Sequence, residues 1–208
     1  NDLYASPIEP LVFRLAEKFM PGPLTIVYKK SAIVPDLISS GLDTVAVRFP
    51  SHPVARDLIR AAGCPIAAPS ANKSGKPSPT TAQDVLLDMD GIIAGVLDGG
   101  ACDIGVESTI IDTTGKDPVI LRPGGITREM IKMAMGRVAL DPGLVKKGET
   151  PKAPGMKYTH YAPKAPLTLI EGMPTRMARA FQREVARQQA RGRQRPNQAD
   201  EAGRIAAR

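Results

Sequence analysis

Hydroxyl and amide side chains are concentrated in one stretch of the sequence, "APSANKSGKPSPTTAQDV", which runs from Ala68 to Val85. The stretch lies between an apolar run and a run with helical character. Side-chain donors at such a place, together with the free N–H groups of the helix that follows, suit the binding of phosphate oxygens. The donors are Ser70, Asn72, Ser74 and Ser78. Serine and asparagine are also ordinary turn formers, so this stretch alone leaves a plain surface turn open.

Two arginines stand at the ends of apolar stretches, Arg48 in "TVAVRFP" and Arg122 in "VILRPGG". A guanidinium at the end of a buried strand is costly unless an anion meets it. Pairing with Asp43 or Asp112 is the structural alternative. A third stretch, "GVESTIIDTT", brings Ser108 to the start of another strand. If these side chains converge on one face of a sheet, they form a pocket for a nucleotide and a carboxylate.

The elements that would position these residues alternate between strands and helices, which predicts an α/β fold. The two strands on either side of 114–117 have hairpin spacing, so the sheet is predicted to be mixed rather than purely parallel. Strands are expected at Leu24–Lys30, Thr44–Pro50, Pro65–Ser70, Gly95–Gly100, Glu107–Thr113, Pro118–Pro123 and Leu167–Gly172, and the strand at Pro65–Ser70 is expected to be buried. Helices are expected at Ser51–Gly63 with Ser51 as its cap, from Thr81 with Asp84 in a capping box, at Thr127–Met135 and from Pro174.

Composition limits the classes of function. The 208 residues are 42% hydrophobic and only 4% aromatic, so the core is aliphatic. No run is long enough to cross a membrane, and the first residues show no signal peptide. Cys64 and Cys102 are the only cysteines, which favours reduced thiols and a cytoplasmic protein. We find no spacing of metal ligands, no Walker-type loop and no Ser-His-Asp arrangement.

The chain is expected to contain three parts: a domain at 1–145, an extended Pro- and Lys-rich linker at 146–166, and the start of a second α/β domain at 167–208. The last part holds nine arginines against four acids, a net charge of +5 out of +7 for the whole chain. Such a tail can bind nucleic acid, although a solvated helix face followed by a flexible linker is the simpler explanation. A lone strand and helix cannot bury their own apolar face, and the chain begins at Asn1. Both features indicate a fragment of a longer protein.

Six motifs occur in order: "PGPLTIVYKK", "DTVAVRFPSHP", "PIAAPSANKSGKPSPTTA", "LDGG", "GVESTIID" and "ILRPGGIT". Together they resemble the YrdC-like threonylcarbamoyl-AMP synthases. "APGMKYTHYAPKAPL" is similar to the interdomain linker of the longer, two-domain form. The resemblance covers roughly residues 10–172. It implies a twisted mixed open sheet with flanking helices, followed by a Rossmann-like second domain.

The resemblance implies an enzyme that joins L-threonine, bicarbonate and ATP into threonylcarbamoyl-AMP and releases pyrophosphate, with Mg²⁺ bridging phosphates. A threonylcarbamoyl transferase complex would then modify tRNA. No protein nucleophile is required, so no catalytic residue is assigned. The implied ATP contacts are Thr44, Ser70, Asn72, Ser78 and Arg122. The implied threonine contacts are Arg48, Ala68 and Ser108, and the linker residues Tyr158, His160 and Tyr161 would form a lid over the pocket.

The sequence departs from the family pattern in one respect. The family's Lys-x-Arg motif should precede "EKFMPGPLTIV", and the residues before that stretch lack it. This absence predicts that the 208-residue chain is inactive alone. Two other functions share the fold: a non-catalytic module that binds double-stranded RNA or tRNA weakly, and a carbamoyl transferase of the hydrogenase-maturation type. The second of these usually carries zinc-finger motifs, which this sequence lacks.

Overall fold

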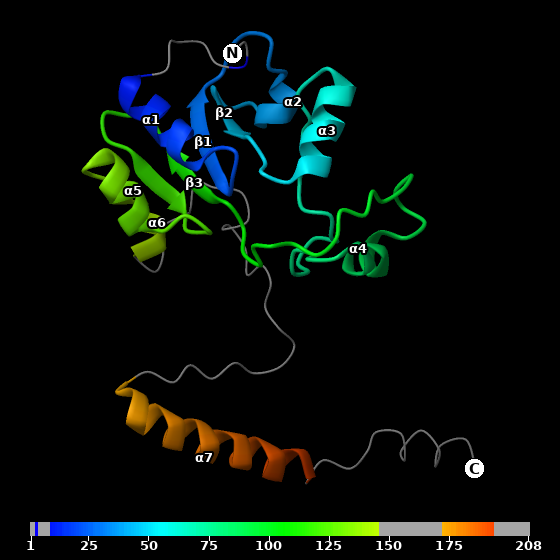
Figure 1. Cartoon of the computed structure of the whole chain (residues 1–208), viewed down its shortest axis with the longest axis vertical. Coiled ribbons are helices and arrows are strands. Elements are labelled where there is room, and N and C mark those ends of the chain that lie inside the picture. The colour runs from blue at the N-terminus through cyan, green and yellow to red at the C-terminus, as the bar shows by residue number, and fades with distance from the viewer. Residues whose placement is uncertain (1–2, 4–8, 146–171, 194–208) are drawn as a thin grey trace. The chain divides into compact units, whose positions relative to one another are not determined.

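The computed structural model describes residue 3, residues 9–145 and residues 172–193 (Figure 1). The chain divides into two compact units, Asn1–Ala162 and Pro163–Arg208, which are described separately below. The predicted linker at 146–166 lies outside the described residues, as does almost all of the strand expected at 167–172.

The first unit is built on a five-stranded mixed sheet with the strand order β2-β1-β3-β4-β5. Strands β1 and β3 are parallel, as are β4 and β5, whereas β1 pairs with β2 and β3 pairs with β4 in antiparallel fashion. The predicted mixed sheet and the predicted hairpin between β3 and β4 are therefore confirmed. The strands are β1 Leu24–Lys29, β2 Thr44–Arg48, β3 Thr109–Asp112, β4 Val119–Arg122 and β5 Ala139–Leu140.

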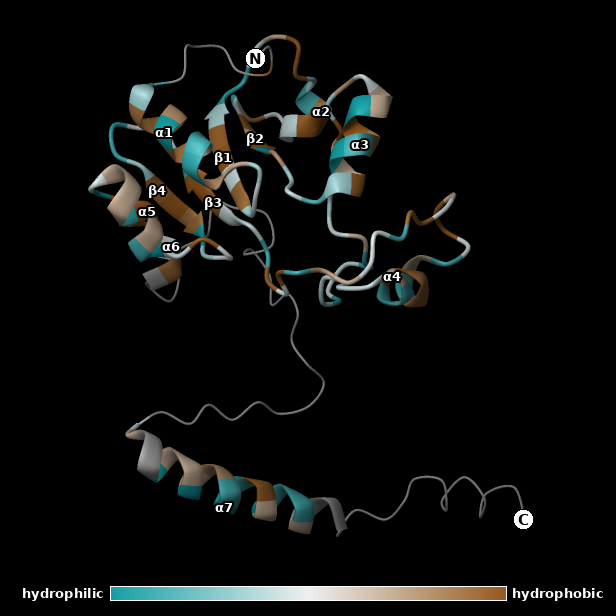
Figure 2. Ribbon diagram, in the orientation of Figure 1, coloured by the Kyte–Doolittle hydropathy of each residue, from teal (hydrophilic) through white to brown (hydrophobic). Residues whose placement is uncertain are grey.

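Helices α1 and α5 cover one face of the sheet (Figure 1). Leu24, Ile26 and Ile111 alternate toward this face, and Leu15 of α1 and Ile131 of α5 pack against them. Figure 2 shows the resulting concentration of apolar residues along the strands. The helices of the described residues are α1 Pro10–Phe19, α2 Asp36–Ser39, α3 Pro53–Ala62, α4 Ala82–Met89, α5 Arg128–Met135, α6 Pro142–Val145 and α7 Pro174–Arg193.

Local capping explains where α4 and α5 begin. Thr81 accepts the N–H of Asp84, and the Asp84 carboxylate accepts the N–H of Thr81, so the predicted capping box is confirmed. Thr127 caps α5 through the N–H of Met130. Gly63 ends α3 in the left-handed conformation with φ +65°. These caps satisfy backbone groups that the first and last turns leave unpaired.

Three predictions about the segment between β2 and β3 are wrong. Pro65–Ser70 and Gly95–Gly100 form no strand, and Pro65–Ser70 is exposed rather than buried. An apolar run requires a neighbouring strand to satisfy its backbone, and among the described strands neither segment has one. Ser51 does not cap α3, because the helix begins one residue later, after His52, without a side-chain cap.

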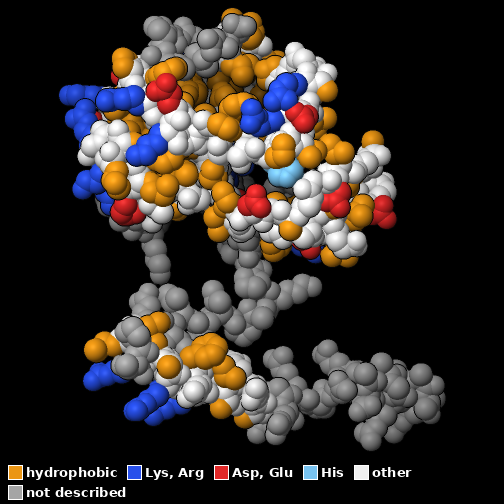
Figure 3. Space-filling model, viewed as in Figure 1, with side chains coloured by type: hydrophobic (Ala, Val, Ile, Leu, Met, Phe, Trp, Pro, Cys, Tyr) orange, Lys and Arg blue, Asp and Glu red, His pale blue; other side chains and the backbone are white. Residues whose placement is uncertain are grey.

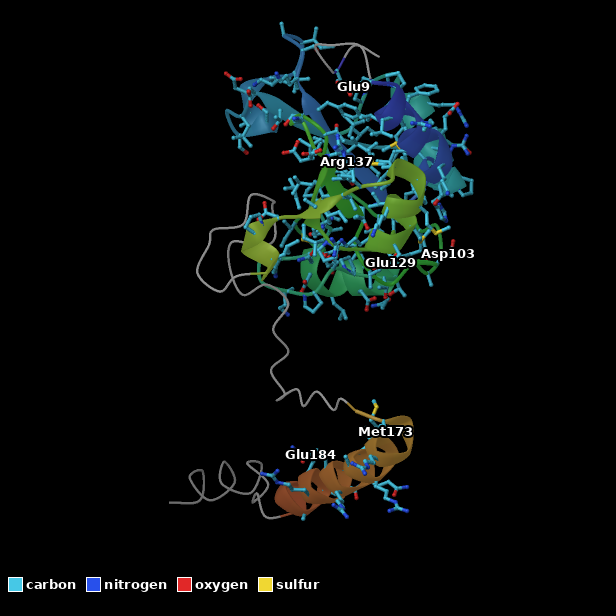
Figure 4. All side chains as sticks on the ribbon, turned by 90° about the vertical axis from the view of Figure 1, so that its left-hand side faces the viewer. Glu9, Asp103, Glu129, Arg137, Met173 and Glu184 are labelled. Atoms are coloured by element: carbon cyan, nitrogen blue, oxygen red, sulfur yellow. The ribbon has the colours of Figure 1, made fainter. Side chains whose placement is uncertain are left out.

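The second unit is described only over its helix α7. Glu184, labelled in Figure 4, accepts hydrogen bonds from Arg187 and Gln188 on the next turn of this helix. Phe181 and Val185 are exposed on α7, one turn apart. The predicted amphipathic helix from Pro174 is thus confirmed. None of the helices in the described ranges is both long and apolar enough to cross a membrane.

Candidate active site

The face of the sheet opposite α1 and α5 carries a row of register partners that crosses four strands. Arg48 of β2 pairs with Thr25 of β1, Thr25 with Ile110 of β3, and Ile110 with Arg122 of β4. Side chains of register partners lie on the same face of a sheet. The chain therefore brings both arginines, which are 74 positions apart in sequence, to one surface. Figure 3 shows that the molecule is hollowed between the sheet and the part that bears α3 and α4.

Arg48 is held at the edge of this surface by the loop before β1. Its Nε donates to the carbonyl oxygen of Gly22 at 3.1 Å, and Gly22 N–H donates to Phe49 O at 2.8 Å. No ion pair to Arg48 occurs within the described part of the chain. Partial burial lowers the pKa of Arg48, and the nearby charge of Arg122 lowers it further. A guanidinium in this setting remains charged and lacks a counter-ion.

Arg122 is tied to the start of β3. Its Nε and one terminal nitrogen donate to the carbonyl oxygen of Ser108 at 3.2 and 3.0 Å, and the same terminal nitrogen reaches Ser108 Oγ at 3.1 Å. The other terminal nitrogen lies 4.0 Å from a carboxylate oxygen of Glu107. The pairings with Asp43 or Asp112 that sequence left open are not formed. Glu107 therefore neutralises Arg122 only loosely.

A glycine brings the turn after β4 against the strand that carries Ser108. A Cβ atom on Gly124 would lie 2.2 Å from the carbonyl oxygen of Glu107 and 2.6 Å from the backbone nitrogen of Thr109. Gly125 N–H donates to the same Glu107 oxygen at 3.1 Å. Only glycine permits this approach. The "RPGG" motif thus sets the distance between Arg122 and Ser108.

The loop opened by Ser70 is positioned by its own backbone and by α4. The side-chain nitrogen of Asn72, Nδ2, donates to the backbone carbonyl oxygens of Lys73 and Lys76, both at 3.0 Å. Asp88 of α4 accepts the N–H of Lys73 at 3.3 Å and pairs with Lys76 at 3.5 Å. These contacts hold the loop as a compact turn against the last turn of α4.

The predicted residues divide into two groups. The first group surrounds Arg122, which bonds to Ser108 and lies near the carboxylate of Glu107. Ser78 Oγ donates to that carboxylate at 3.1 Å. Arg48 is close enough to Arg122 for the two charges to repel each other. Thr44 lies on β2 four residues before Arg48 and so shares its face.

The loop residues Ala68, Ser70 and Asn72 are not in hydrogen-bond contact with either arginine, and Ala68 and Ser70 are exposed. Tyr158, His160 and Tyr161 lie outside the described residues.

Two site residues were missed by the sequence reasoning. Thr25 lies between the arginines and bonds to Ser108 at 2.8 Å, and Glu107 links Ser78 to Arg122. Glu107 could have been found, since a charged residue directly before Ser108 in an apolar context is unusual. Thr25 gave no such signal, because threonine is common in strands.

The described residues include no group of three or more His, Cys, Asp or Glu side chains placed to hold a metal ion. Cys64 and Cys102 are both free and exposed.

An open mixed α/β sheet with two cationic side chains and a row of hydroxyl groups on one face is a surface that suits small anionic ligands. Residues 2–124 match the family of Sua5, YciO and YrdC proteins, described as "Telomere recombination". Residues 126–204 match "Threonylcarbamoyl-AMP synthase, C-terminal domain". The chain belongs to the Sua5–YciO–YrdC family.

Its relatives include proteins named threonylcarbamoyl-AMP synthase. The one from Bacillus subtilis is 53% identical over 81% of this chain and 49% of its own length, and the one from Pyrococcus abyssi is 51% identical over 83% and 51%. A crystal structure of P. abyssi Sua5 with L-threonine matches 92% of this chain and 56% of that chain, with a TM-score of 0.84 and 47% identity. The chain spans about half the length of these curated relatives.

Proposed function

We propose that this chain carries the nucleotide- and threonine-binding core of an L-threonylcarbamoyl-AMP synthase. The reaction joins L-threonine, bicarbonate and ATP into threonylcarbamoyl-AMP and pyrophosphate. The observation that carries the proposal is the pair Arg48 and Arg122 on one sheet face, with Ser108 bonded to the second. The relatives named above and the crystal structure with L-threonine support the same assignment.

The chemistry explains why such a site suffices without a protein nucleophile. The amine of threonine adds to bicarbonate, water leaves, and an N-carboxylate forms. An oxygen of that carboxylate attacks the α-phosphorus of ATP, the bond to the β-phosphate oxygen breaks, and pyrophosphate leaves. The protein has to hold several anions close together and offset the charge on the phosphates. Guanidinium and hydroxyl donors perform that task directly.

The residues divide between the two substrates. Arg48 is proposed to grip the threonine carboxylate through its two terminal nitrogens, since its Nε is already bonded to Gly22. Ser108 and the backbone at Ala68 would complete the threonine site. Arg122 and Ser78, with Thr44, Ser70 and Asn72, would contact ATP. The exposed position of Ser70 in its loop leaves its hydroxyl free to reach a phosphate.

The proposed site would also include a magnesium ion, a carboxylate that holds it and a lid from the linker. Mg²⁺ would arrive with the ATP phosphates, because Mg²⁺ keeps several waters and commonly binds through substrate phosphates and one or two carboxylates. Glu107 is the carboxylate in contact with the described site residues and could hold it. The linker residues Tyr158, His160 and Tyr161 would close over the pocket.

The product of the proposed reaction indicates which partner enzyme would use it. A threonylcarbamoyl transferase complex that acts on tRNA would consume threonylcarbamoyl-AMP, and we propose that both proteins work in the cytoplasm. We also propose that 1–145 is the catalytic domain, 146–166 the linker and 167–208 the start of an accessory domain.

A second candidate, a module that binds RNA without catalysis, is favoured by the arginines on α7. Arg176, Arg179, Arg183 and Arg187 are exposed and recur every three to four residues, which places them on one side of the helix. Binding of this kind would contact phosphates and weaken steeply with added salt.

One assay separates the two candidates. The full-length protein is incubated with L-threonine, bicarbonate and ATP, and released pyrophosphate is measured with each substrate omitted in turn. A synthase releases pyrophosphate only when all three are present. If none is released and RNA binding survives Arg48→Ala, the RNA module is correct and the synthase proposal fails.

A further inference from the structure

Thr25 has a buried hydroxyl in the middle of the proposed site, and none of the roles assigned above uses it. It lies on β1 between Arg48 on one neighbouring strand and Ile110 on the other. Thr25 is 9% exposed and Ser108 is 7% exposed, and their hydroxyl oxygens lie 2.8 Å apart. A buried hydroxyl is costly without a hydrogen bond, and this contact provides one. The burial shows that Thr25 acts on Ser108 rather than on solvent.

The hydrogen-bonding capacity of Ser108 limits what this contact can do. A serine hydroxyl has one proton to donate and two lone pairs that accept. Arg122 can only donate, so its bond to Ser108 Oγ occupies one lone pair. Either hydroxyl can be the donor in the bond between Thr25 and Ser108. If Thr25 donates, both lone pairs of Ser108 are occupied and its proton must go to a third group.

That third group has to be an acceptor. With Arg122 and Thr25 both donating to it, Ser108 can offer a ligand only its O–H. The positive charge of Arg122 also polarises that O–H and makes it a stronger donor. Ser108 would therefore select an oxygen of the bound amino acid and reject an ammonium group at the same place.

We propose that Thr25 is a positioning residue that donates to Ser108 Oγ and thereby makes Ser108 a hydrogen-bond donor to a carboxylate oxygen of the threonine substrate. The inference rests on the proposed function. In the empty site the two hydroxyls satisfy each other. When an oxygen acceptor binds, Ser108 turns its proton to the ligand and Thr25 supplies the replacement bond, so no buried oxygen loses its partner.

The test compares Thr25→Val with Thr25→Ser in the full-length protein. Valine keeps the branched shape of threonine, which β-strands favour, and removes only the hydroxyl. Thr25→Val is expected to raise the KM for L-threonine about tenfold, the scale of one hydrogen bond to a charged group, while the KM for ATP stays within about twofold. Thr25→Ser is expected to recover most of the lost affinity.

Two controls isolate the hydroxyl. Thr113→Val removes a threonine hydroxyl that donates to the Val27 carbonyl at 2.9 Å, at the far end of the same strand pair, and should leave the KM for threonine unchanged. The double variant Thr25→Val with Ser108→Ala should be no worse than Ser108→Ala alone, because Thr25 acts through Ser108. Thermal midpoints of all variants show whether a loss of affinity comes from unfolding.

Three results would overturn the inference: an unchanged KM for threonine in Thr25→Val, a serine variant as impaired as the valine variant, or additive losses in the double variant. If Thr25→Val does not fold, Thr25→Ala, which also lacks the hydroxyl, is compared with and without Ser108→Ala and decides the question by the same criterion of additivity. Failure of the proposed function is seen separately, as absence of pyrophosphate release by the unaltered protein. In that case calorimetric titration with L-threonine alone still tests the roles of Thr25 and Ser108. An absence of threonine binding to the unaltered protein would overturn the inference.

Discussion

The guanidinium groups of Arg48 and Arg122 act on each other across two intervening strands. Burial is the larger cause of the lowered pKa of Arg48, and the charge of Arg122 is the next. Adjacent strands lie about 4.8 Å apart, so β2 and β4 are separated by roughly 14 Å. Two long side chains on the same face at that separation leave room for a small anion between them. The repulsion between them is relieved when such an anion binds.

Arg48→Ala should therefore abolish most threonine binding. We expect the KM for threonine to rise by about tenfold to a hundredfold, because a charge-assisted hydrogen bond to the carboxylate is lost. Arg48→Lys should recover only part of the affinity, since an ammonium cannot make the forked contact. Steady-state pyrophosphate release at varied threonine concentration measures the effect.

Arg137→Ala is the matched control for this loss of charge. Arg137, labelled in Figure 4, pairs with Asp117 at 3.1 Å and is largely exposed. Removing it should leave the KM for threonine unchanged. An equal effect of both substitutions would mean that net charge, rather than the position of Arg48, governs threonine binding.

Gly124→Ala should damage stability and the site together. A new Cβ would meet the backbone of Glu107 and Thr109, which cannot move aside without displacing β3. Overpacking of this kind costs about 1–3 kcal/mol. The thermal midpoint should fall, and the KM for both threonine and ATP should rise because Ser108 shifts relative to Arg122.

Gly115→Ala serves as the control in the hairpin between β3 and β4. A Cβ there would find its nearest neighbour, Asp117 O, at 3.9 Å. We expect a change within about 0.5 kcal/mol in the free energy of unfolding. If Gly124→Ala behaved the same way, close backbone approach would not be what places Ser108.

Local patterns predicted the parts of the fold that local interactions determine. The β-branched residues of Leu24–Lys29 and Thr44–Arg48 predicted their strands, and the spacing of Thr81 and Asp84 predicted the start of α4. Pro65–Ser70 was predicted as a strand from its apolar residues alone. A strand also requires a partner in space, which local composition does not contain.

The residues of the candidate site could be predicted from local sequence, but their arrangement in space could not. Arg48 and Arg122 could be singled out because each ends an apolar strand. That they share one face depends on which strands are neighbours. The first register pair of β1 and β3, Leu24 with Thr109, joins residues that are 85 positions apart in the sequence. The role of Thr25 depends on that register, so the sequence pattern could not show it.

The capping box of α4 should make this part of the chain sensitive to acid. Hydrogen bonds from the Thr81 side chain and the Thr80 backbone lower the pKa of Asp84. A carboxyl whose folded pKa is depressed stabilises the fold above its unfolded value of about 4, and loses that contribution as the pH falls through the folded pKa. The thermal midpoint of the unaltered protein should therefore exceed that of Asp84→Asn at pH 6, and the difference should shrink below about pH 4. A constant difference down to pH 2 would show that the charge of Asp84 contributes nothing.

Asp88→Asn should weaken ATP binding without touching the threonine site. The carboxylate of Asp88 holds the loop of Ser70 and Asn72 through Lys73 N–H at 3.3 Å and Lys76 at 3.5 Å, and its side chain is mostly enclosed. With asparagine there, the ion pair is lost and the loop gains freedom that ATP must remove on binding. We expect the KM for ATP to rise about threefold to tenfold, with the KM for threonine within twofold, about the scale of one partly buried ion pair. Asp90→Asn, just beyond the end of α4, is the control and should change neither constant. If the KM for threonine rose as much as that for ATP, the loop would serve both substrates and the division of the site between them would have to be redrawn.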